Sequence, residues 1–119
     1  MKILHIPDVN GNNTVKSLAS MFSSAGVQLP PGNKVKWVRL TEITAGTTNT
    51  RVGNSSVSTT NGMTLNATAD GLYLPAVAGY DEDSLYDLNL IYIYHATGDT
   101  VSIAVGVWDF DKAPVPYKK

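Results

Sequence analysis

The chain offers few residues whose types and spacing could do chemistry. Its two histidines, His5 and His95, lie far apart, and neither belongs to a spaced metal-ligand pattern. It has no cysteine, which excludes thiol catalysis, disulfides and thiolate metal sites. No zinc-protease, nucleophile-elbow or phosphate-loop motif occurs. We therefore expect no enzymatic activity, no catalytic residue, no metal ligand and no cofactor. His95 is expected at the surface or in an interface.

The densest group of carboxylates is Asp81-Glu82-Asp83, with Asp87 nearby. Oxygen ligands at this spacing could hold Ca²⁺, but the run lacks the glycine and the terminal glutamate of a helix–loop–helix calcium loop. Paired carboxylates can hydrolyse glycosides when they face each other, a geometry that adjacent loop residues do not provide by themselves. We interpret the run as a solvated loop or a charged contact, with a cation site as the alternative. Asp109 and Asp111 flank Phe110, and these two carboxylates likewise do not provide a catalytic geometry by themselves.

The composition favours one small all-β domain. A chain of 119 residues is long enough for one hydrophobic core but not for two. Charged residues make up only 16%, and the abundant Ser, Thr, Asn and Gly suit turns and sheet faces. The net charge of −1 argues against a nucleic-acid partner. Because no apolar run is long enough to span a bilayer and the N-terminus lacks a signal-peptide pattern, we expect no membrane partner and synthesis in a cytosol.

Residues 1–32 are expected to form an N-terminal arm and a helix. Ile3–Ile6 could pair as a short edge strand before Pro7 ends regular structure. A helix is predicted at about 14–25, with Asn13 or Thr14 as its N-cap and Gly26 beyond its C-terminus. Its apolar face would either pack on the chain's own sheet or dock on a partner. That face consists of Val15, Leu18, Met21, Phe22 and Ala25.

Residues 33–108 are expected to form a two-sheet β-sandwich. The pattern over 34–43 alternates, with Val35 and Trp37 on one side and Val38 and Leu40 on the other. Shorter strands are predicted at 48–52, 56–59, 63–65 and 72–74, separated by Gly and Asn turns. The jelly-roll arrangement is preferred over an immunoglobulin-like one.

The strongest pattern runs from Leu85 to Trp108. Residues 88–95 are largely apolar on both faces, as in a strand from the middle of a sandwich. Gly98 suits the first position of a type II′ turn, so we predict a hairpin that returns through 101–108. The return strand places bulky residues on one face and small ones on the other: Val101, Ile103, Val105 and Val107 against Ser102, Ala104 and Gly106.

Residues 109–119 are expected to form an extended C-terminal tail. Pro114 and Pro116 lie between Phe110 and Tyr117, and prolines at this spacing favour extended structure because they remove hydrogen-bond donors. Two interpretations stay open. The tail is either free or an arm that lies on a neighbouring molecule.

Four runs are similar to a pattern found in small structural proteins of tailed bacteriophages. They are Arg51–Ser58 (RVGNSSVS), Gly71–Pro75 (GLYLP), Tyr86–Tyr94 (YDLNLIYIY) and Ala96–Ile103 (ATGDTVSI). The pattern extends over about residues 35–107, most of the chain, whereas residues 1–30 and the tail after Trp108 fall outside it. The resemblance is to virion components, some of which are capsid decoration or cement proteins.

This resemblance implies a structural virion protein on the capsid surface, with the major capsid protein and further copies of itself, as a homotrimer, as partners. The expected contact residues come from the helical face and the C-terminal end: Val15, Leu18, Phe22, Trp108, Phe110 and Tyr117. Two alternatives remain. One is a tail, neck or fibre module. The other is a carbohydrate-binding sandwich that stacks sugars on Trp37, Tyr92, Tyr94 or Trp108.

Overall fold

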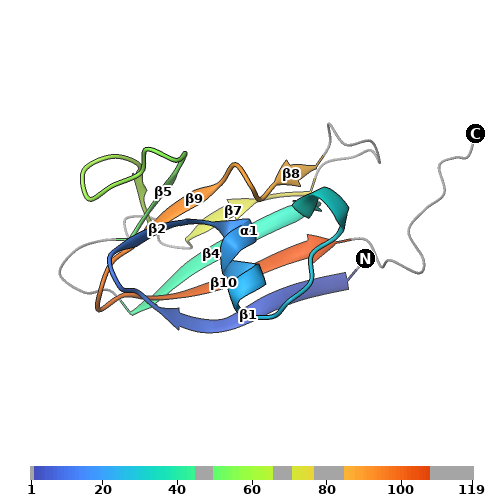
Figure 1. Ribbon diagram of the computed structural model, residues 1–119, viewed down its shortest axis with the longest axis horizontal. Coiled ribbons are helices and arrows are strands. Elements are labelled where there is room, and N and C mark those ends of the chain that lie inside the picture. Colours follow the sequence, from blue (N-terminus) through green and yellow to red (C-terminus); the bar gives the residue numbers. More distant parts are fainter. Residues whose placement is uncertain (1, 45–49, 66–70, 77–84, 108–119) are drawn as a thin grey trace, which may run out of the picture.

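The structure is a computed structural model that describes residues 2–44, 50–65, 71–76 and 85–107. These residues form ten strands, one α-helix and one short 3₁₀ helix (Figure 1). The helix α1 spans Leu18–Ser24, and the 3₁₀ helix spans Pro31–Asn33. The strands are β1 (Lys2–Asn10), β2 (Thr14–Ser17), β3 (Lys34–Val35), β4 (Trp37–Thr44), β5 (Arg51–Gly53), β6 (Met63–Thr64), β7 (Leu72–Leu74), β8 (Tyr86–Asp87), β9 (Tyr92–His95) and β10 (Thr100–Val107).

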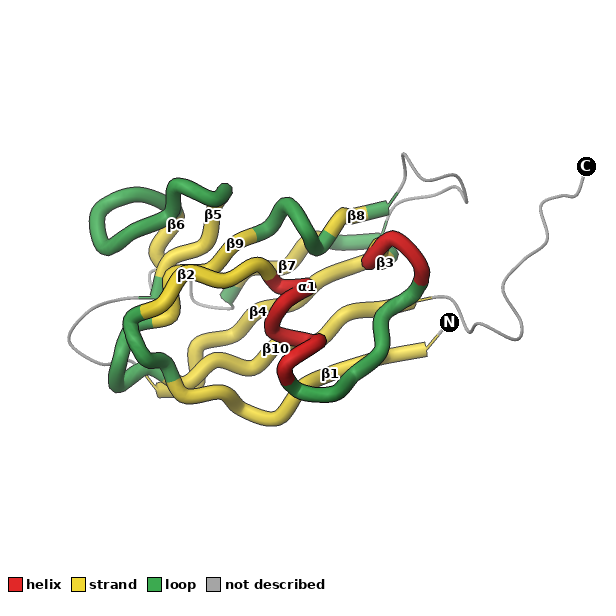
Figure 2. The backbone as a smooth tube through the Cα atoms, viewed as in Figure 1, coloured by secondary structure: helices red, strands yellow, loops and turns green. Residues whose placement is uncertain are grey.

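The strands pair in a nested order, the first with the last. All of these pairs are antiparallel: β1 with β10, β2 with β9, β3 with β8, β4 with β7 and β5 with β6. Two further contacts, β10 with β4 and β9 with β5, join four of these pairs into two four-stranded sheets, while β3 and β8 form a separate two-stranded sheet. The first sheet has the order β1-β10-β4-β7, and the second has the order β2-β9-β5-β6. The expected all-β, two-sheet architecture with one short helix is therefore confirmed (Figure 2).

Strand β10 organises the core of the first sheet. Its alternation is the predicted one, and Val101, Ile103, Val105 and Val107 are fully buried. Val38 and Leu40 of β4 are buried beside them, as are Val52 and Ile93 from the second sheet. Because one strand face supplies so much of this cluster, the alternation in the sequence is enough to place β10 at the centre.

The prediction that residues 88–95 and 101–108 pair with each other as a hairpin is wrong. Strands β9 and β10 follow one another in the chain, but β9 belongs to the second sheet and β10 to the first. The connection between them therefore crosses from one sheet to the other, and Gly98 takes a positive φ of 92° in it. Alternation shows which residues face the core, whereas the partner of a strand depends on residues far away in the sequence.

The N-terminal residues are an integral part of the sandwich, not an arm outside it. β1 pairs with β10 from Lys2 to Asn10, with an irregularity between Ile6 and Val9, and so forms one edge of the first sheet. The helix begins later than predicted, because residues 14–17 form β2 and pair with β9. Ser17 is the N-cap, and its side chain accepts a hydrogen bond from the Ser20 amide at 3.1 Å.

Two further strand predictions need correction. The segment over 34–43 is broken at Lys36, whose amide donates to the Gly106 carbonyl at 2.7 Å, so Val35 and Val38 both face the interior. Residues 56–59 form turns instead of a strand, because the Asn54 side chain accepts from the Ser56 amide at 2.9 Å. Of the predicted strand over 48–52, residues 48 and 49 lie outside the described residues, and Arg51 and Val52 lie in β5.

Candidate interaction surfaces

The outer face of the first sheet carries a row of large exposed side chains. The register places Ile3 of β1 opposite Gly106 of β10, and Gly106 opposite Trp37 of β4. In the next row, Arg39 of β4 lies opposite Tyr73 of β7. Ile3 is 65% exposed and Tyr73 is 49% exposed. We call Ile3, Trp37, Arg39 and Tyr73 the tryptophan face.

Gly106 lets the Trp37 indole lie across the central strand. A Cβ atom at position 106 would lie 1.9 Å from Trp37 Nε1, so only glycine leaves room for the ring. The Tyr73 ring meets the indole edge-on, with centroids 6.4 Å apart and an angle of 61° between the planes. The Arg39 guanidinium carbon lies 5.6 Å from the centroid of the Tyr73 ring. These contacts hold Trp37, Arg39 and Tyr73 together, and Ile3 lies in the same row on the other side of Gly106.

The outer face of the second sheet carries a second group of rings. Ile93 points into the core, so its neighbours Tyr92 and Tyr94 in β9 point outward. Val15 of β2 and Arg51 of β5 lie opposite Tyr94 on either side. Arg51 donates through Nη1 to the Gly62 carbonyl at 2.8 Å. We call Val15, Arg51, Tyr92 and Tyr94 the tyrosine face.

The structure separates the predicted contact residues. Val15 is 42% exposed and lies on the tyrosine face, in β2. Leu18 and Phe22 have no exposed surface, because α1 covers the core with them, so they are core residues. Trp108, Phe110 and Tyr117 lie outside the described residues, as does the acidic run Asp81-Glu82-Asp83. Sequence analysis missed Tyr73, whose exposure follows from its place on the edge strand β7.

A cluster of polar side chains is enclosed where the chain crosses between the sheets. Glu42 of β4 faces inward opposite Val101, Thr50 precedes β5, and Asp99 precedes β10. Thr50 and Asp99 have no exposed surface, and Thr50 Oγ1 donates to Asp99 Oδ2 at 2.8 Å. His95, the last residue of β9, is also buried, so its expected surface position is wrong.

Burial changes the protonation of this cluster. Both carboxylate oxygens of Glu42 are shielded from solvent without a well-formed hydrogen bond. This burial, and next the neighbouring Asp99 carboxyl, raise the Glu42 pKa from 4.5 to about 7. Burial lowers the pKa of His95, whose Nε2 also lacks a partner, against the opposing influence of Asp99. The buried polar cluster therefore favours the protonated, neutral form of the Glu42 carboxyl.

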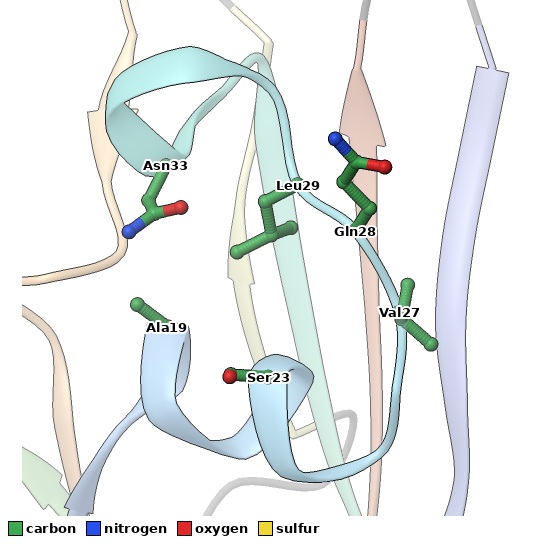
Figure 3. Close-up of a pocket in the computed structure, with 6 residues that line it drawn as sticks. All are labelled: Ala19, Ser23, Val27, Gln28, Leu29 and Asn33. Carbon is green, nitrogen blue, oxygen red and sulfur yellow. The ribbon is translucent and has the colours of Figure 1, made fainter.

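A shallow hollow of about 260 Å³ lies beside α1 (Figure 3). Ala19 and Ser23 of the helix line one side, and Val27, Gln28 and Leu29 of the following connector line the other. Asn33 closes one end, but its side-chain amide donates to Asn89 Oδ1 at 3.0 Å and so already has a structural role. The hollow brings together no acid–base pair.

No protein-family model, curated protein or solved structure matches this chain. Within residues 2–44, 50–65, 71–76 and 85–107, no three metal-binding side chains are grouped closely enough to hold an ion. Among the same residues, the helices are all too short to cross a membrane.

Proposed function

We propose that the chain is a structural virion protein of a tailed phage: a capsid cement protein that binds and stabilises the assembled shell. One observation carries the proposal. The chain completes its own core and still presents exposed apolar side chains on both outer faces of the sandwich: Ile3 and Tyr73 on the first sheet, and Val15 beside the half-buried Tyr92 and Tyr94 on the second. Large exposed apolar surfaces on a small folded protein mark contacts with other proteins. The role is therefore one of binding, not of catalysis.

The nested strand order supports the same proposal by analogy. Pairing the first strand with the last, with eight of the ten strands in two four-stranded sheets, is an order similar to that of jelly rolls, and we propose that the chain is one. Viral capsid domains and lectins both use this architecture. The fold is therefore consistent with a virion role but does not by itself assign one. The four sequence runs that resemble phage virion proteins add the second, independent support.

A cement protein stabilises a shell by mass action. A ligand that binds the assembled shell and not the free subunits adds a free energy of RT ln(1 + [L]/Kd), about 2.7 kcal/mol for each site at a concentration 100 times Kd. Several contacts from one oligomer to adjacent shell subunits add avidity. Such a protein needs a rigid body with contact surfaces, which the two sheets provide.

We assign the shell contact to the tyrosine face. Tyr92 lies between Ser17 of β2 and Gly53 of β5, so its half-buried ring has small residues on both sides. Val15 adds an exposed aliphatic side chain next to Tyr94. Tyrosine rings with an adjacent arginine are typical of the central, energetically dominant part of protein interfaces.

The carbohydrate-binding alternative uses the same rings in another way. Sugar stacking requires a flat ring open to solvent, and Trp37 and Tyr73 meet at 61°, so they do not form a shared platform. A tail, neck or fibre location uses the same surfaces as a capsid location. The location of the chain on the particle therefore distinguishes a capsid role from a tail, neck or fibre role better than the residues of its surfaces do.

The test uses phage particles assembled without this chain, to which the purified protein is added. We expect saturable binding to assembled shells, little binding to free shell subunits, and a higher temperature of genome release. Tyr92→Ser should weaken shell binding at least tenfold. Leu90→Ser, which removes a 68% exposed side chain in a turn outside both faces, should leave it unchanged.

Equal binding to free subunits, or no binding to shells, would contradict the cement role. Binding of only a few copies at the tail end would favour the tail or neck alternative. Tight binding to a glycan array by the wild type, abolished by Tyr92→Ser, would favour the lectin alternative.

A further inference from the structure

We propose that the tryptophan face binds the C-terminal segment, residues 108–119, of a second copy of the chain. This contact would join copies to one another, whereas the tyrosine face would contact the shell. The inference does not depend on the proposed function, because self-association can be measured on the purified protein alone.

The face has the form of a docking surface for an extended segment. Along β10 the outward positions are the small residues Ser102, Ala104 and Gly106, and the large side chains stand on the neighbouring strands. The Trp37 indole covers Gly106, with Ile3 on one side and Tyr73 on the other. The result is a low apolar surface that crosses all four strands of the first sheet.

The C-terminal segment has matching chemistry. Its sequence Ala113–Tyr117 (APVPY) favours the extended polyproline conformation, which is formed before binding and so loses little entropy on binding. Proline-rich segments of this kind bind surfaces lined by aromatic rings. Near the start of the segment, Asp109 and Asp111 carry charge opposite to that of Arg39 at the side of the face, whereas Lys112, Lys118 and Lys119 are positive.

The segment begins beside the face and is long enough to reach another copy. β10 ends at Val107, one residue beyond the row of Ile3, Gly106 and Trp37. Twelve extended residues span about 37 Å at about 3.1 Å each. Four strands about 4.8 Å apart present a surface about 15 Å across. The segment can therefore leave one copy and still cross the whole face of the next.

Exchange between copies fits the sequence better than folding back onto the same copy. To lie on its own face, the segment would have to reverse direction soon after Val107. Residues 108–113 contain no glycine or proline, and the first proline is Pro114, so Asp109 and Asp111 are the only residues of this stretch that favour a turn. A contact that passes from each copy to the next closes into a ring, as in the homotrimer that the phage resemblance implies.

The experiment measures the oligomeric state of the full chain by sedimentation over a range of concentrations. Three variants are compared with the wild type: Tyr73→Ser on the face, a double variant Pro116→Ala and Tyr117→Ser in the segment, and the control Leu90→Ser. We expect an oligomeric wild type and control. Each of the first two variants should associate at least tenfold more weakly, with unchanged circular dichroism.

Mixing the two weakened variants tests the contact itself. The segment variant keeps an intact face and the face variant keeps an intact segment, so the mixture should form one-to-one pairs that neither variant forms alone. A wild type that is monomeric at every concentration overturns the proposal. So does an oligomer that both variants leave unchanged, or a mixture that forms no pairs.

Discussion

Replacing Glu42 by glutamine should change the pH dependence of stability in a defined direction. The Glu42 pKa is about 7 in the folded protein against an ordinary value of 4.5, because its carboxyl is buried beside Asp99. Between these two pH values the folded state holds more protons than the unfolded state. The free energy of unfolding contributed by Glu42 is therefore fully present below about pH 4.5 and is lost as the pH rises through 7.

The size of the effect follows from the two pKa values. At about 1.36 kcal/mol for each pKa unit, the upper limit is about 3 kcal/mol. Part of the Glu42 side chain still contacts solvent, and screening reduces this limit, so we expect about 1–2 kcal/mol. The glutamine variant is neutral at every pH. Its stability relative to the wild type should therefore rise by that amount from about pH 4.5 to about pH 8.

The assay is urea denaturation of both proteins at several pH values, with the difference in unfolding free energy plotted against pH. His95, whose pKa burial lowers, favours unfolding at low pH, but it is present in both proteins and largely cancels in the difference. A difference that stays constant with pH, or that falls as the pH rises, would refute the reasoning about this cluster.

Four other substitutions test the packing. Thr50→Val removes the buried hydroxyl that donates to a carboxylate, and should lower the unfolding free energy by about 1–3 kcal/mol in chemical denaturation. Phe22→Ala should cost about 3–5 kcal/mol in the same assay. Val15→Ser should lower the unfolding free energy by no more than about 0.5 kcal/mol. Equal losses of unfolding free energy in Phe22→Ala and Val15→Ser would contradict the placement of Phe22 in the core and Val15 at the surface. Gly106→Ala should displace the Trp37 ring, cost about 1–3 kcal/mol, and change the near-ultraviolet circular dichroism; an unchanged spectrum would contradict the close contact.

The local features of the fold could be predicted from the sequence because they depend on nearby residues. The alternation of Val101, Ile103, Val105 and Val107 identified a buried face, and the small residues between them indicated close packing on the other side. The positive φ of Gly98 was also predicted, since turn chemistry is local. Such patterns show which residues are inside without showing which strands meet.

The remaining features depend on contacts between distant parts of the chain. Residues 14–17 have a helical pattern, but pairing with β9 makes them a strand, so tertiary contacts override local preference. Likewise, nothing near Glu42 in the sequence indicates Asp99 as its neighbour. Their meeting follows from the nested pairing, which brings the ends of β4 and β9 together with the start of β10.

The most direct test of the account is an image of the intact particle at a resolution that orients each copy of the chain. The account predicts copies on the capsid surface with Tyr92 and Val15 against the shell, and with Tyr73 covered by the C-terminal segment of an adjacent copy. Copies that are absent from the shell, or that leave both outer faces open to solvent, would contradict it.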